Sequence, residues 1–107
     1  MRKLLLVALV SACTPTSYTF SPTVTRFTAR PAGCEFTILA TAPDESFEEI
    51  GTMQHYNGDV PMQEAAFRTA IAARVCDVGG NAVIAQRTSE GYKTATIIKL
   101  SNSRNSH

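Results

Sequence analysis

Three cysteines are the residues of this chain best suited to covalent chemistry, and their positions separate one of them from the other two. Cys13 follows an apolar stretch near the first methionine, whereas Cys34 and Cys76 lie in the more regular part of the chain. A thiolate is the nucleophile that accepts a lipid group, and two thiols in an oxidising compartment form a disulfide. We therefore expect a lipidation site at Cys13 and a disulfide between the other two.

The first twelve residues have the layout of an export signal. Arg2 and Lys3 form a basic start, and the apolar run Leu4–Ala12 follows. This run has the length of a signal-peptide core, because a helix that spans a bilayer needs about 20 apolar residues. Valine, serine and alanine precede Cys13 and match the lipobox, in which an aliphatic and two small residues stand before the lipidated cysteine. We expect a signal peptide over residues 1–12; the alternative is an ordinary secretory signal cleaved near Ala12.

The lipid would also determine the location of the protein. One acyl chain binds membranes marginally, whereas several together hold firmly. Thr14 follows Cys13, so no aspartate stands there as a retention signal for the inner membrane. We expect a protein anchored to the outer membrane, facing the periplasm or the cell surface.

Two segments are predicted to lie outside the folded domain, a lipidated tether at 13–32 and a disordered tail at 101–107. The tether contains three prolines and many hydroxyl residues, and the tail is polar, compositions typical of extended or disordered chain. Four bulky residues are unusual in a pure spacer: Tyr18, Phe20, Val24 and Phe27. They are either leftover apolar residues or a short strand laid on the domain, or they are docking residues for a partner.

The domain is predicted to span residues 33–100 with the element order ββαββ. Alternating apolar residues indicate strands, and alanine-rich sequence with apolar residues three or four positions apart indicates a helix. The expected elements are strands 34–40, 47–55, 81–87 and 92–100, with a helix over 61–78. Pro61 suits the first helical position, Gly79 and Gly80 end the helix, and residues 88–91 form a turn. We expect an α+β fold in which one helix packs on one face of a small four-stranded sheet.

A disulfide between Cys34, at the start of the first strand, and Cys76, at the end of the helix, would link these two elements. A bridge between them closes a loop of about 42 residues, which corresponds to about 4 kcal/mol of stabilisation by chain entropy. Small exported domains often compensate in this way for a marginal core. The alternative is that both thiols are reduced and buried as small apolar side chains.

Three stretches carry a resemblance to known proteins: Arg30–Cys34, Phe47–Gly51 and Val75–Ile84. They resemble small bacterial envelope lipoproteins of uncharacterised function, and the layout is similar to the domain of the Rcs-type outer-membrane stress-sensor lipoprotein. The resemblance covers about residues 30–100 and implies lipidation and a small domain. That sensor has four domain cysteines in two disulfides, whereas this domain has two cysteines, so a shared signalling mechanism is not implied.

Catalytic and ligand-binding chemistry has little support in the sequence. His55 is the one histidine of the predicted domain, and its spacing to Asp59 and Glu64 matches no metal cage. Glu48 and Glu49 are adjacent on a predicted strand, so their side chains point to opposite faces and make a poor acid–base pair. The chain has 10 Lys and Arg residues and 9 Asp and Glu residues, and the basic residues form no patch of the kind that nucleic acid requires. We expect no enzyme, metal, cofactor or nucleic-acid partner.

One helix can cover one face of the sheet, which leaves the other for solvent, the tether or a partner. We predict that Thr37, Leu39 and Thr96 belong to a partner surface, and that the domain binds another envelope protein as a sensor, an adaptor or an accessory subunit. Two alternatives stay open. One is a small-ligand or metal-binding module, and the other is a redox sensor in which Cys34 and Cys76 switch between thiol and disulfide.

Overall fold

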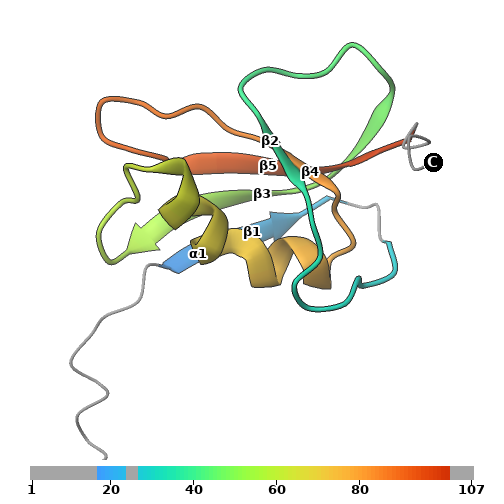
Figure 1. The fold of residues 1–107 in the computed structure, drawn as a ribbon, viewed down its shortest axis with the longest axis horizontal. Coiled ribbons are helices and arrows are strands. Elements are labelled where there is room, and N and C mark those ends of the chain that lie inside the picture. The colour runs from blue at the N-terminus through green and yellow to red at the C-terminus, as the bar shows by residue number, and fades with distance from the viewer. Residues whose placement is uncertain (1–16, 24–26, 102–107) are drawn as a thin grey trace, which may run out of the picture.

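The computed structural model describes residues 17–23 and 27–101 and has an α+β fold with one helix and a five-stranded mixed sheet (Figure 1). The elements are β1 (Ser17–Pro22), β2 (Thr37–Leu39), β3 (Phe47–Asn57), α1 (Glu64–Asp77), β4 (Ala82–Ile84) and β5 (Thr94–Leu100). The predicted fold class is confirmed. The predicted signal peptide, Cys13, Val24 and residues 102–107 of the predicted tail lie outside the described residues.

The prediction of four strands is wrong, because the segment assigned to the tether contributes a fifth. Strand β1 pairs antiparallel with β3 along the edge of the sheet. Tyr18 and Phe20 pack against the core, whereas Thr19 and Ser21 alternate with them and are exposed. For Tyr18 and Phe20, the interpretation of the bulky tether residues as a short strand laid on the domain is therefore correct.

Several element boundaries also differ from the prediction. The helix begins at Glu64 instead of Pro61, because the carbonyl of Pro61 accepts a hydrogen bond of 2.9 Å from the backbone N–H of Tyr92. Strands β2 and β4 are three residues each because they pair with one another over that length. The turn at residues 88–91 is confirmed, since Thr88 and Gly91 exchange two backbone hydrogen bonds of 3.0 Å.

The strands are arranged in the order β1-β3-β5-β4-β2. Strand β5 is the last in the chain but lies at the centre of the sheet, antiparallel to both β3 and β4. Strand β2 is parallel to β4 and forms the second edge. Helix α1 connects β3 to β4, and these two strands are parallel to one another on either side of β5.

Helix α1 covers one face of the sheet and forms the core with it (Figure 1). Phe67, Ile71 and Val75 are fully buried, as the apolar stripe predicts, and pack with Ile97 and Met53 from the sheet. The helix ends at Asp77, one residue before the predicted end, and the predicted helix stop Gly79 has a φ of +84°, a left-handed conformation that glycine adopts without strain.

Gly51 allows β1 to lie against β3. A Cβ atom at this position would be 2.5 Å from ring carbons of Phe20 and 2.8 Å from the carbonyl oxygen of Ser21. We expect Gly51→Ala to lower the free energy of unfolding by about 1–3 kcal/mol through overpacking, measured by urea denaturation. The cost should shrink when Phe20→Ala makes room for the methyl group, so an equal cost in both backgrounds would contradict this account.

Candidate functional site

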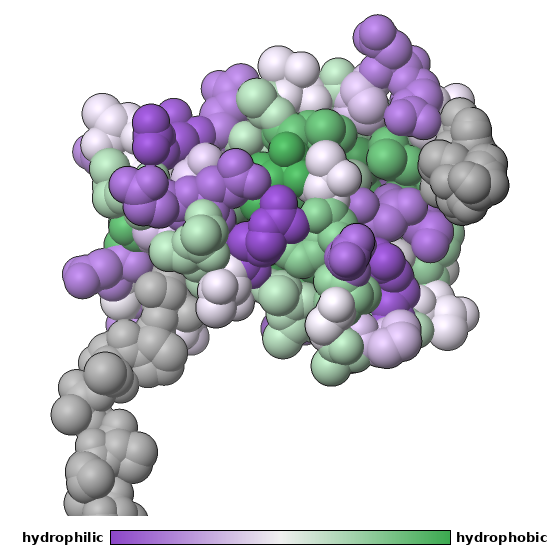
Figure 2. All heavy atoms as spheres, viewed as in Figure 1, coloured by the Kyte–Doolittle hydropathy of each residue, from purple (hydrophilic) through white to green (hydrophobic). Residues whose placement is uncertain are grey.

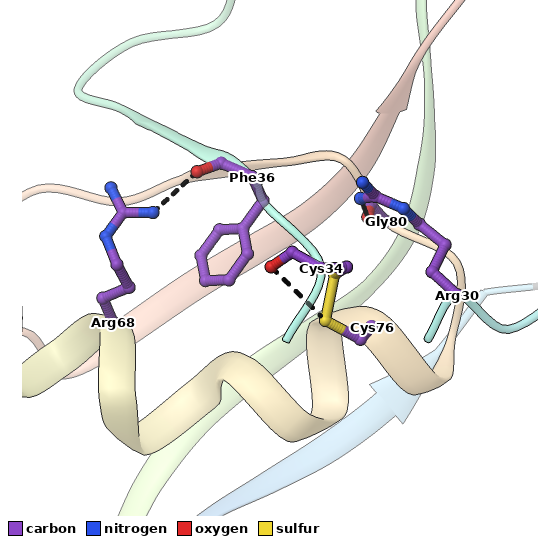
Figure 3. The surroundings of a disulfide bond; sticks show 6 residues. All are labelled: Arg30, Cys34, Phe36, Arg68, Cys76 and Gly80. Atoms are coloured by element: carbon purple, nitrogen blue, oxygen red, sulfur yellow. Dashed lines mark hydrogen bonds between the residues drawn. A yellow bond between two sulfur atoms is a disulfide. The ribbon is translucent and has the colours of Figure 1, made fainter. Parts of the chain in front are cut away.

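Cys34 and Cys76 form a disulfide, which confirms the predicted pair. The S–S distance is 2.04 Å, the Cα atoms are 5.9 Å apart, and 42 positions separate the two residues. Cys76 is buried in the last turn of α1, whereas Cys34 is half-buried in the segment that leads into β2 (Figure 3). The bridge therefore ties the start of an edge strand to the end of the helix.

Two arginines reinforce this connection (Figure 3). Arg68 donates a hydrogen bond of 2.6 Å to the carbonyl oxygen of Phe36, and its guanidinium carbon lies 5.0 Å from the centroid of the Phe36 ring. Arg30 donates from its side chain to the carbonyl of Gly80 and from its backbone to the carbonyl of Cys76. The approach of Cys76 Sγ to the carbonyl of Cys34, at 3.8 Å, is a contact, because a disulfide sulfur has no proton to donate.

The predicted partner residues lie on the face of the sheet opposite α1. Their neighbours Ile38, Ala95 and Ile97 point into the core under the helix, and successive side chains of a strand point to opposite faces. The register forms one row of aligned residues across all five strands: Leu39, Ile84, Thr96, Thr52 and Ser21. Thr37 belongs to a second row with Ala82, Ile98 and Glu49. The structure therefore brings Thr37, Leu39 and Thr96 together on what we call the helix-free face.

The helix-free face combines an apolar centre with a polar border. Leu39 and Ile84 are half-buried and form the accessible apolar part, Thr37 and Glu49 are exposed, and Ile98 is fully buried and offers no surface to a partner. Figure 2 shows the other side of the molecule, on which α1 lies, where hydrophobic residues gather between hydrophilic ones. Ile84 also belongs to the helix-free face, and no local sequence pattern places it there, because its position depends on the pairing of β4 with β2 and β5.

His55 and Tyr18 form a partly buried cluster on the opposite face. Their ring centroids are 5.5 Å apart in an edge-on arrangement, and Nε2 of His55 is buried without a hydrogen-bond partner. The hydroxyl of Tyr18 donates a hydrogen bond of 2.7 Å to the carbonyl of Tyr92, and burial raises the pKa of Tyr18 to about 12. Within residues 17–23 and 27–101, no three His, Cys, Asp or Glu side chains come together as metal ligands.

No protein-family model, curated protein or solved structure matches this chain. The resemblance to envelope lipoproteins therefore rests on the sequence motifs quoted above. In the described part of the chain, no helix has the length and apolar character needed to cross a membrane.

Proposed function

We propose that this protein is an outer-membrane lipoprotein whose disulfide-linked domain binds another envelope protein through the helix-free face. It would act as a sensor, an adaptor or an accessory subunit of an envelope assembly. The observation that carries the proposal is the row of Leu39, Ile84 and Thr96, which places apolar side chains on the sheet face that α1 does not cover.

The disulfide supports the exported location. Disulfides persist in oxidising compartments and are rare in the cytosol, where thiols are kept reduced. A Cys34–Cys76 bridge is therefore what export by the signal at residues 1–12 would produce. The lipobox that ends at Cys13 would in addition leave a lipid at the new amino terminus, so that the domain remains at the membrane.

The composition of the helix-free face supports a protein as the ligand. A protein interface has an apolar centre and a polar rim that forms hydrogen bonds. Leu39 and Ile84 would supply the apolar contact, while the hydroxyl groups of Thr37, Thr52 and Thr96 would exchange hydrogen bonds with the partner. The exposed charge in the Thr37 row is Glu49, so we expect binding that depends weakly on salt.

Site-specific photocrosslinking in cells tests this function. A photoreactive residue in place of Thr37 or Thr96 should yield one discrete product with another envelope protein. The same residue in place of Ala66, which is exposed on α1, is the matched control and should not yield it. In addition, Thr37→Arg should reduce the product formed from position 96, because an exposed arginine at the rim would obstruct the partner. No product, or equal products from positions 96 and 66, would contradict the proposal.

A further inference from the structure

A groove of about 540 Å³ separates α1 from the edge strand β1, which lies beside the helix in Figure 1. Tyr18, Met53 and Tyr56 line it from the strands, and Ala70, Arg74 and Asp77 line it from the helix. Tyr56 is 64% exposed, the largest exposure among the bulky apolar and aromatic residues described. The groove lies on the helix side of the sheet and is therefore separate from the helix-free face.

The outer edge of β1 is open to a further strand. Among the described strands β1 pairs with β3 alone. The backbone N–H of Thr23 donates to the carbonyl of Ile50 on β3, and alternate residues of an antiparallel strand direct their backbone groups to the same side. Ser21 therefore faces β3, whereas Phe20 directs its N–H and C=O outward. Pro22, which has no N–H, lies on the outward side, the placement that proline takes in edge strands.

The groove has an apolar end and a charged end. At the apolar end, the ring centroids of Tyr18 and Phe67 are 6.0 Å apart, and Phe67 lies about one helical turn before Ala70. At the charged end, the guanidinium carbon of Arg74 lies 5.0 Å from the centroid of the Phe20 ring. The helix and β1 therefore run in the same direction along the groove.

We propose that this groove binds an extended segment of another protein, which adds to β1 as an antiparallel sixth strand and carries an acidic residue two positions before an apolar residue. Adding a strand at a sheet edge is a recurrent mode of peptide recognition, in which backbone hydrogen bonds supply affinity and alternate side chains supply specificity. The proposal does not depend on the function proposed for the helix-free face.

The spacing of the two ends explains the proposed motif. Residues two apart in a strand are about 6.7 Å apart along its axis and point to the same side. Ala70 and Arg74 are four residues apart in α1, which corresponds to a rise of about 6 Å. One side chain of the added strand can therefore fill the space over Ala70 while the next on that side meets Arg74. Because an antiparallel strand runs from the Phe20 end toward Tyr18, the acidic residue comes first.

The charges of the groove favour an acidic residue at the Phe20 end. Arg74 stacks on Phe20 and forms no ion pair with a carboxylate of the described residues. An incoming carboxylate would give this guanidinium a charge-assisted hydrogen bond. Asp77 lies three residues further along the helix, and its negative charge would repel an incoming carboxylate. Removing this charge is therefore expected to strengthen binding of an acidic segment, whereas removing the charge of Arg74 should weaken it.

The test uses the purified protein and a fluorescein-labelled peptide, Thr-Thr-Glu-Thr-Leu-Thr-Thr, with binding followed by fluorescence anisotropy. We expect saturable binding that weakens about tenfold when lysine replaces the glutamate of the peptide. Arg74→Glu should reverse this preference, and Asp77→Asn should tighten binding of the glutamate peptide about threefold. Because Arg74→Glu also removes the contact with Phe20, its folding is checked by urea denaturation, and the Asp77→Asn and peptide comparisons do not depend on it.

Two further measurements test the strand pairing and the identity of the occupant. A peptide whose alternate backbone amides are methylated should bind at least about tenfold more weakly, since it cannot donate to β1. Absence of saturable binding, or equal binding of the glutamate and lysine peptides, would overturn the proposal. A dimer in sedimentation that dissociates when the peptide is added would also overturn the proposal. The strand that pairs with β1 would then belong to a second copy of this chain.

Discussion

Removal of the Cys34–Cys76 disulfide is expected to lower the free energy of unfolding by about 4 kcal/mol. The bridge closes a loop of 42 positions and so restricts the unfolded chain, and a domain of this size has a total stability of about 5–15 kcal/mol. Urea denaturation of the Cys34→Ala, Cys76→Ala double variant measures this loss. Alanine is preferred to serine because Cys76 is buried, and a buried hydroxyl would add its own cost.

Reduction of the unaltered protein provides the control for the double variant. A reducing agent should destabilise the unaltered protein by a similar amount and leave the double variant unchanged. A loss below about 1 kcal/mol would contradict this account, because the bridge would then restrict the unfolded chain far less than its loop of 42 positions implies.

Cys13→Ala is expected to abolish incorporation of radiolabelled palmitate, because the proposed lipid attaches to the sulfur atom of Cys13. The uncleaved apolar run Leu4–Ala12 would still hold such a variant at the membrane. A second variant therefore replaces the first thirteen residues with an ordinary secretory signal. We expect this protein in the soluble periplasmic fraction, with the Cys34–Cys76 disulfide intact by mass spectrometry.

The matched control is Cys34→Ala with Cys76→Ala, which should retain full palmitate labelling because Cys13 is unchanged. Continued labelling of Cys13→Ala would exclude this residue as the lipid site. Membrane retention of the secretory-signal variant would show that a contact other than the lipid holds the domain at the membrane.

Local signals in the sequence predicted the helix and the side of it that is buried. Phe67, Ile71 and Val75 recur at the helical period, and all three are fully buried against the sheet. Gly79 ends α1 as predicted because its left-handed conformation disfavours other residues. The Cys34–Cys76 pair could also be predicted, since the proposed export would leave two domain cysteines that can join one another.

Strand β1 shows where local signals were insufficient. Its alternation of Tyr18 and Phe20 with hydroxyl residues is short and flanked by prolines, so composition alone favoured a tether. The strand forms because β3 offers an open edge and Gly51 leaves space for the ring of Phe20. The same pairing creates the groove beside Arg74, which depends on residues more than 50 positions apart.

The sequence by itself determined the amphipathic helix, its end, the α+β class and the pairing of Cys34 with Cys76. Each of these depends on the chemistry of a few residues or on their local period. Only the tertiary structure decided that β5 lies between β3 and β4, that Leu39 aligns with Ile84 and Thr96, and that β1 completes one edge. Strand order and register are set by which distant segments bury one another's side chains, and a single sequence does not contain that choice in any local pattern.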